Sequence, residues 1–112
     1  MCGFCGILNF DKNSQVDPSL ITRMSSTLAH RGPDDAGAYM AGPIGFGHRR
    51  LSIIDIEGGH QPMKSVGPEP LQVVVYNGEI YNYITLCGEL KNLGHTFSTA
   101  SDTEVLLAAY RQ

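Results

Sequence analysis

The sequence predicts one domain that mixes helices and strands. At 112 residues the chain is near the usual size for a single hydrophobic core. Some stretches carry apolar residues at helical spacing, and others are short apolar runs bounded by turn-forming residues. No internal repeat, low-complexity tract or linker divides the chain, so residues 1–112 are predicted to form one domain.

The first elements follow from local patterns. Residues 3–10 predict a strand whose apolar side chains are expected to fill the core: Ile7, Leu8 and Phe10. A helix is predicted from Pro18 to about Ala29, because Asp17 suits the N-cap and Pro18 the first helical position. Its buried stripe would be formed by Leu20, Ile21, Met24 and Leu28.

The middle of the chain predicts a loop and further strands. Residues 30–37 are dense in turn formers and predict a loop. Residues 38–41 and 44–50 predict a hairpin across Gly42-Pro43, and 56–70 predict largely irregular chain. Residues 71–76 are the strongest predicted strand, and their apolar run suggests burial on both faces.

Two more helices are predicted near the end. One begins near Asn82, ends at a left-handed cap on Gly94, and presents one apolar face: Ile84, Cys87, Leu90 and Leu93. Residues 95–98 predict a short strand. Ser101 and Glu104 match a capping box at the start of the last helix. This helix reaches Gln112 without a C-cap, so we expect the chain to be the N-terminal portion of a larger domain.

Composition excludes several classes of function. The net charge of −3 argues against a nucleic-acid surface, which would be basic. No apolar run approaches the ~20 residues of a membrane span, and no signal peptide is evident. The three cysteines suit a reducing compartment, so a cytoplasmic location is expected.

Cys2 is the first candidate for chemistry. Removal of Met1 would leave a thiol and a free α-amine on one residue, with ordinary pKa values of ~8.5 and ~7.7–8.0. A weak thiol nucleophile needs a nearby base, and an N-terminal amine can supply one. Position alone is weak evidence, because most cysteines at position 2 have no such role.

Four further features fit a site built on Cys2. Asn77-Gly78 follows the strongest strand and could form an oxyanion hole, although the same pair is common in hairpin turns. Arg50, at the end of a strand, could hold a carboxylate, whereas Arg49 is better explained as a surface residue. Asp102 could receive an ammonium group or serve only the helix dipole. The loop at 30–35 would form a wall or flap over the site.

Five ordered motifs together resemble the class II glutamine amidotransferases. They are Met-Cys-Gly at 1–3, His-Arg-Gly-Pro-Asp at 30–34, Arg-Leu-Ser-Ile-Ile-Asp at 50–55, Asn-Gly-Glu-Ile-Tyr-Asn at 77–82 and Ser-Asp-Thr-Glu-Val at 101–105. Within that family the chain looks most like the N-terminal domain of glutamine-hydrolysing asparagine synthetases. The resemblance implies an α+β fold, the four-layer αββα sandwich of N-terminal-nucleophile hydrolases, of which this chain would be the N-terminal portion.

The resemblance also implies roles for residues. Cys2 would be the nucleophile and its α-amine the base, with Asn77 and Gly78 as the oxyanion hole. Arg50 would bind the glutamine α-carboxylate and Asp102 its α-ammonium. Three residues would line the substrate through backbone groups: Ile53, Ile54 and Glu79. Glutamine would become glutamate and ammonia through a thioester.

The chain departs from the family pattern in extent. It contains no synthetase domain, so ATP and Mg²⁺ are expected only in that partner domain and no cofactor or metal is expected here. It is also shorter than the family's amidotransferase domain. Uncovered core strands would invite self-association, which makes a homodimer a possible assembly.

Two alternatives remain open at this stage. Cys2 and Cys5 could be half of a zinc or redox site, but Cys87 stands alone and the histidines lack ligand spacing, so Cys5 is better explained as a core residue. The chain could also be an inactive fragment that at most binds glutamine or associates with a missing segment.

Overall fold

The computed structural model describes residues 1–67 and 71–112. In these ranges the chain forms helices and short strands in the order β1 (Gly3–Leu8), α1 (Pro18–Ser26), β2 (Asp35–Ala41), β3 (Ile44–Arg50), β4 (Met63–Lys64), β5 (Val73–Val74), α2 (Tyr83–Asn92) and α3 (Asp102–Arg111).

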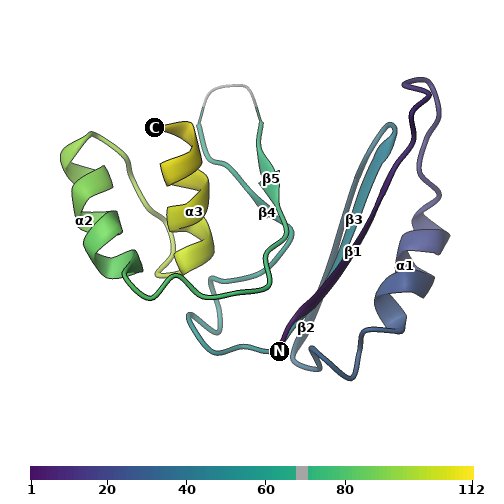
Figure 1. The fold of residues 1–112 in the computed structure, drawn as a ribbon, viewed down its shortest axis with the longest axis horizontal. Helices are drawn as coiled ribbons and strands as arrows, with labels where there is room; N and C mark the ends of the chain where they lie inside the picture. The colour runs from purple at the N-terminus through teal and green to yellow at the C-terminus, as the bar shows by residue number, and fades with distance from the viewer. Residues whose placement is uncertain (68–70) are drawn as a thin grey trace.

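The N-terminal half is an antiparallel sheet covered on one face by a helix (Figure 1). The strand order is β1-β3-β2, and the β2–β3 pair confirms the predicted hairpin. Gly45 and Gly47 of β3 lie against Ile21 of α1, and a Cβ at position 45 would come within 3.0 Å of the Ile21 side chain. The two glycines therefore let α1 approach the sheet, and Ile21 becomes fully buried.

The C-terminal half begins with a second antiparallel sheet, in which β4 pairs with β5. Across Figure 1, α1, the three-stranded sheet, the β4–β5 pair and the helices α3 and α2 follow one another. The helices α2 and α3 pack against each other, and Leu90 of α2 and Val105 and Leu107 of α3 are buried. In the described ranges, no helix has the length and apolar character needed to cross a membrane.

The predicted strand over 71–76 is wrong in extent and burial. Only Val73–Val74 pair as a strand, and both residues are half-buried. Their partner is β4, which lies inside the stretch 56–70 that was predicted to be irregular. Residues 68–70 of that stretch lie outside the described residues. The apolar run over 71–76 therefore extends beyond the paired residues Val73 and Val74. Its last residues lie in the chain that leads to Asn77.

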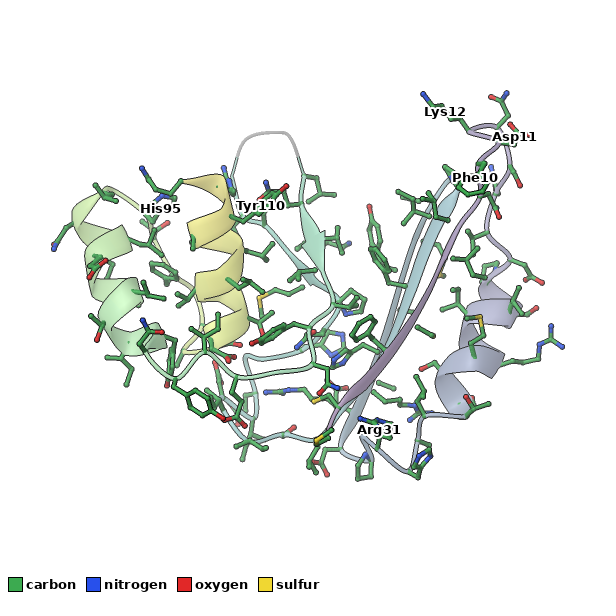
Figure 2. The ribbon with its side chains drawn as sticks, in the orientation of Figure 1. Phe10, Asp11, Lys12, Arg31, His95 and Tyr110 are labelled. Atoms are coloured by element: carbon green, nitrogen blue, oxygen red, sulfur yellow. The ribbon has the colours of Figure 1, made fainter. Side chains whose placement is uncertain are left out.

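The predicted core of β1 is wrong for Leu8 and Phe10, whereas Ile7 is half-buried. Leu8 is 62% exposed and Phe10 is 97% exposed. Figure 2 shows Phe10 beside Asp11 and Lys12 at the tip of the β1–α1 connection, away from the packed part of the molecule. The face of β1 that meets α1 carries Gly3 and the half-buried Cys5 and Ile7, whereas Leu8 lies on the opposite face of the strand.

The helix starts are confirmed. Asp17 accepts a hydrogen bond from the backbone of Ser19, and Ser101 accepts one from Thr103. Glu104 does not complete the predicted capping box, because its carboxylate instead accepts from the backbone N–H groups of Ser98 and Thr99. Those contacts hold residues 95–98 as irregular chain, so the strand predicted there is wrong.

Two expectations for α2 have different outcomes. Gly94 has φ of +95°, which confirms the left-handed cap after the helix. The predicted apolar face is only partly buried: Leu90 is 5% exposed, but Ile84 is 72% and Leu93 is 62% exposed. Helical spacing identified the helix, and the packing of α3 against it determined how much of that face is covered.

Candidate active site

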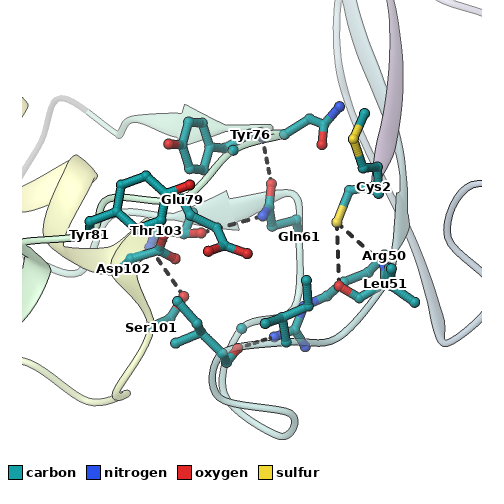
Figure 3. Close-up of a pocket in the computed structure, with 16 residues that line it drawn as sticks. Cys2, Arg50, Leu51, Gln61, Tyr76, Glu79, Tyr81, Ser101, Asp102 and Thr103 are labelled. Carbon is teal, nitrogen blue, oxygen red and sulfur yellow. Dashed lines mark hydrogen bonds between the residues drawn. The ribbon is translucent and has the colours of Figure 1, made fainter.

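One pocket collects every residue that the sequence singled out as a site residue. Its volume is ≈ 270 Å³, the scale of a small-molecule site rather than a macromolecular interface. Figure 3 shows that it lies between the end of the three-stranded sheet, the chain after β5 and the start of α3. The predicted residues in its lining are Cys2, Arg50, Ile53, Ile54, Asn77, Gly78, Glu79 and Asp102.

Cys2 is held by residues far away in sequence. The backbone N–H of Leu51 donates to the Cys2 sulfur at 3.3 Å, and the Cys2 thiol lies 3.6 Å from the Leu51 carbonyl oxygen as a donor (Figure 3). The Arg31 Nε donates to the Cys2 carbonyl oxygen at 3.1 Å. These contacts hold the Cys2 sulfur at the edge of the pocket. Cys2 directly precedes the first residue of β1.

Met1 also lines this pocket and is 73% exposed. While Met1 is attached, the nitrogen of Cys2 belongs to a peptide bond and has no lone pair available as a base. The base that the sequence predicts can therefore exist only after Met1 has been removed.

The loop at 30–34 braces the segment that holds Cys2. The Asp34 N–H donates to the Arg50 carbonyl oxygen at 3.0 Å, and the Asp34 carboxylate accepts from the Ser52 N–H at 2.8 Å. Gly32 packs so closely on the backbone of Arg49 that a Cβ would overlap it. Among the described residues, none from 30–35 lines the pocket, so the predicted wall or flap is wrong. The loop instead positions Leu51 from behind.

Arg50 is 5% exposed, and its guanidinium is already engaged. Nη2 donates to the carbonyl oxygens of Ile54 and Asp55, each at 2.6 Å, and Nη1 donates to that of Ile56 at 2.9 Å. A guanidinium has five N–H groups, and a two-bond grip on a carboxylate uses one from Nη2. Such a grip would have to displace one of the two Nη2 contacts.

The turn that receives Arg50 is fixed by Asp55. This residue has φ of +47°, a left-handed conformation that Asp tolerates better than most residues. Its carboxylate accepts from the N–H groups of Gly58 and Ala100, each at 2.8 Å. Those two hydrogen bonds hold the pKa of Asp55 below its ordinary value. Asp55 thus links the Arg50 turn to the segment that precedes α3.

Asp102 is the first residue of α3 and is 6% exposed. One carboxylate oxygen accepts from the N–H of Ile80 at 3.0 Å. A buried carboxylate is stabilised by hydrogen bonds and by the helix N-terminus, which carries partial positive charge. The structure therefore places a held, buried acid at the opposite side of the pocket from Cys2.

Asn77 and Gly78 are exposed in the turn between β5 and α2. Within the described ranges no intramolecular hydrogen bond involves either residue, so the Asn77 amide and the Gly78 N–H are available to a ligand. The ring of Tyr76 lies against Gly78, and a Cβ at position 78 would come within 2.6 Å of the Tyr76 hydroxyl. Close approach of this ring explains why the position suits glycine.

Sequence reasoning did not single out Gln61 and Tyr76, which line the pocket, or His48, which contacts Tyr76 from outside the lining. His48 is fully buried, and its Nε2 lies 3.2 Å from the Tyr76 carbonyl oxygen. Burial lowers the pKa of His48, and the Tyr76 carbonyl only partly offsets that effect. Period-two alternation along β3 could have placed His48 on the same face as Arg50, but no local pattern marks Gln61.

No cluster of three or more His, Cys, Asp or Glu side chains that could hold a metal ion occurs in residues 1–67 and 71–112. The cysteines Cys2, Cys5 and Cys87 are free thiols. Burial raises the pKa of Cys5, which lies beside Gly47 at the α1 face of the sheet.

The fold and the pocket define a small α+β domain, built on antiparallel sheets, whose small-molecule-sized site contains a free thiol. Residues 1–112 match the glutamine amidotransferase domain family along their whole length, and the chain belongs to this family.

Curated relatives support the same assignment. The chain is 49% identical over 113 residues to asparagine synthetase (glutamine-hydrolyzing) 1 of Bacillus subtilis (strain 168), with 99% of this chain and 18% of that protein covered. It is 44% identical over 110 residues to asparagine synthetase (glutamine-hydrolyzing) 3 of the same organism, with 98% of this chain and 18% of that protein covered. It is 39% identical over 112 residues to asparagine synthetase (glutamine-hydrolyzing) 1 of Arabidopsis thaliana, with 100% of this chain and 18% of that protein covered. The chain therefore spans less than a fifth of the length of these relatives.

Proposed function

We propose that this domain hydrolyses the side-chain amide of glutamine to glutamate and ammonia, with the Cys2 sulfur as nucleophile. The observation that carries the proposal is that all eight predicted site residues line one pocket of ≈ 270 Å³. Membership of the glutamine amidotransferase family supports glutamine as the substrate.

The proposed reaction has two halves. The Cys2 thiolate attacks the amide carbon, and the resulting oxyanion accepts hydrogen bonds from the Asn77 amide and the Gly78 N–H. The α-amine of Cys2 takes up the thiol proton as the thiolate forms, and it returns this proton to the amide nitrogen as the carbon–nitrogen bond breaks, so that the nitrogen leaves as ammonia. Water attacks the thioester, which releases glutamate and restores the thiol. Removal of Met1 must come first, because it creates the α-amine.

The substrate's charged end is assigned to the other side of the pocket. Asp102 would receive the α-ammonium group, and Arg50 the α-carboxylate after giving up one contact to the turn at 54–56. Ile53, Ile54 and Glu79 would contact glutamine through backbone groups. The buried position of both charged side chains supports these roles, since a charge-assisted hydrogen bond is stronger away from water.

We further propose that the domain belongs to the four-layer αββα class of N-terminal-nucleophile hydrolases. The order of α1, the three-stranded sheet, the β4–β5 pair and the α2–α3 helices in Figure 1 supports this assignment. The names of the relatives support a role in supplying ammonia for asparagine synthesis. We also propose a cytoplasmic location. ATP and Mg²⁺ would then act only in a synthetase domain, and glutamine hydrolysis here would need no cofactor.

One observation favours a second state of the same site. Met1 lines the pocket beside Cys2, and a chain that keeps Met1 lacks the α-amine base, so it would at most bind glutamine without hydrolysing it. Intact mass separates the two states, because loss of Met1 is directly measurable.

The test combines mass and turnover. We expect protein that has lost Met1 to release glutamate and ammonia from glutamine, and Cys2→Ala to abolish this while keeping the fold and glutamine binding. A Cys5→Ala variant is the matched control and should retain turnover. Unchanged hydrolysis in Cys2→Ala would contradict the proposal, as would full activity in protein that still carries Met1.

A further inference from the structure

Gln61 is a buried amide that joins two sides of the pocket. It is 5% exposed, and both ends of its side chain have partners. Its Oε1 accepts from the backbone N–H of Tyr76 at 2.6 Å, and its Nε2 donates to the hydroxyl of Thr103 at 3.3 Å (Figure 3). Tyr76 directly precedes the Asn77-Gly78 pair, and Thr103 directly follows Asp102.

Among the hydrogen bonds of residues 1–67 and 71–112, those that hold the turn from Tyr76 to Ile80 lie at its two ends. Gln61 holds the Tyr76 N–H, and His48 lies against the Tyr76 carbonyl oxygen at 3.2 Å. At the other end, Asp102 accepts from the Ile80 N–H at 3.0 Å. The residues between these points are exposed, so the position of the turn depends on the groups that hold its two ends.

We propose that Gln61 is a positioning residue that sets the Asn77-Gly78 donors relative to the thiol, by tying the start of their turn to the first turn of α3. This inference rests on the proposed glutamine hydrolysis. Oxyanion donors act only within about 2.7–3.1 Å of the developing charge, so a shift of about 1 Å is costly. Gln61 lines the pocket, and the role proposed for it acts through its hydrogen bonds to Tyr76 and Thr103, which engage both ends of its amide.

The amide is suited to this position because it offers one acceptor and one donor without a charge. A backbone N–H can pair only with the oxygen end, which leaves the nitrogen end for the Thr103 hydroxyl. A carboxylate at position 61 would bury a second negative charge near Asp102, which is itself 6% exposed. An apolar side chain would leave the Tyr76 N–H without a partner.

The main variant is Gln61→Met, which keeps a similar volume and removes both hydrogen bonds. We expect kcat for glutamine hydrolysis to fall by about 10- to 100-fold, with KM changed by less than about 3-fold, because the donors shift while the charged end of the site stays in place. Hydrogen exchange at the Tyr76 amide should become faster. The matched control is Gln72→Met, a glutamine outside the pocket whose Oε1 has no hydrogen-bond partner, and it should change none of these values.

A second pair of variants tests the other end of the link and applies even if Gln61→Met fails to fold. Thr103→Val removes the hydroxyl that Gln61 contacts and keeps the side-chain shape, whereas Thr103→Ser keeps the hydroxyl. We expect kcat to be lower in Thr103→Val by about 3- to 10-fold and to lie closer to wild type in Thr103→Ser.

The outcomes separate this inference from the proposed function. If wild type hydrolyses glutamine and Gln61→Met keeps its kcat, the positioning role is wrong and the proposed function stands. A rise in KM without a fall in kcat, or equal kcat in Thr103→Val and Thr103→Ser, would also overturn it. If wild type without Met1 has no turnover, the proposed function fails, and Tyr76 exchange alone then decides whether Gln61 holds the turn.

Discussion

Gly59 packs so closely against Arg50 that a Cβ atom at position 59 would overlap Nη2 of the guanidinium. The Gly59 N–H also donates to the Asp55 carbonyl oxygen at 3.0 Å, and that same oxygen accepts from Arg50. The absence of a side chain at position 59 therefore leaves the space that the Arg50 guanidinium occupies. This guanidinium is the group predicted to bind the carboxylate of glutamine.

The first prediction follows from this contact. Gly59→Ala should displace the Arg50 guanidinium, raise KM for glutamine and lower the free energy of unfolding by about 1–3 kcal/mol. The control is Gly88→Ala in α2, where no atom lies within 4 Å of the new Cβ. Because glycine disfavours a helix interior, that variant should be more stable by about 0.5–1 kcal/mol. Urea unfolding and glutamine kinetics measure both effects, and a wild-type KM in Gly59→Ala would exclude the role assigned to Arg50.

The second prediction concerns Asp102. Asp102→Asn keeps an oxygen that can accept from Ile80 and removes the negative charge, so the fold should be retained. Wild type should prefer glutamine over an analogue that lacks the α-amino group, and this preference should fall by about 10- to 100-fold in the variant, the scale of a hydrogen bond to a charged group worth about 1.5–3 kcal/mol. Competition kinetics with the two substrates measure it. An unchanged preference would remove Asp102 from substrate recognition.

The third prediction compares two thiols. Burial raises the pKa of Cys5, so its reactive thiolate is scarcer at neutral pH than that of a thiol at its ordinary value. A small alkylating agent at pH 7 should therefore modify Cys2 in the pocket well before Cys5 on the α1 face of β1. Peptide mass spectrometry follows both sites, and unfolding in urea should abolish the difference. Equal rates in the folded protein would show that burial does not protect Cys5.

The fourth prediction concerns acid stability. Burial alone would raise the pKa of Glu104, but hydrogen bonds from Ser98 and Thr99 outweigh it and hold the pKa below the ordinary value of 4.5. The folded form therefore binds its proton less readily than the unfolded form. The stabilisation from Glu104 is complete above pH 4.5 and is lost as the pH falls through the folded-state pKa.

The free energy of unfolding, measured from pH 7 down to pH 3, tests whether the pKa of Glu104 is lowered in the folded protein. Glu104→Gln should reduce the loss of stability in acid, since the variant has no carboxylate to protonate. The exposed Glu89 of α2 provides a matched control, and Glu89→Gln should leave the acid dependence of wild type in place. A steeper loss of stability in acid for Glu104→Gln than for wild type would mean that folding does not lower the pKa of Glu104.

Much of the candidate site could be predicted because its residues lie in short ordered motifs. Each motif is local, so Cys2, Asn77 and Asp102 can be recognised without knowing how the chain folds. The hairpin and the helix starts were predicted for a related reason, since turn and capping preferences act over a few residues. The grouping of all eight residues around one pocket agrees with the placement that the motifs implied.

What could not be predicted depends on contacts between distant segments. Phe10 is apolar and belongs by pattern to a core strand, yet it extends past the end of the sheet and is exposed. Gln61 occurs in an irregular stretch, and its importance appears only when Tyr76 and Thr103 lie on either side of it. Arg50 was predicted to bind a carboxylate, and the pattern did not reveal that three carbonyl oxygens of the adjacent turn already accept from its guanidinium.

The pocket brings together Cys2 and Asp102, which lie far apart in the sequence. A growing polypeptide that has only just emerged from the ribosome therefore carries the thiol without Leu51 to orient it or Asp102 to complete the cavity. Such partial products would consume no glutamine and release no ammonia, and the same holds for chains lost to premature termination before α3. Activity of the proposed kind thus reports that translation has run through the last helix described here.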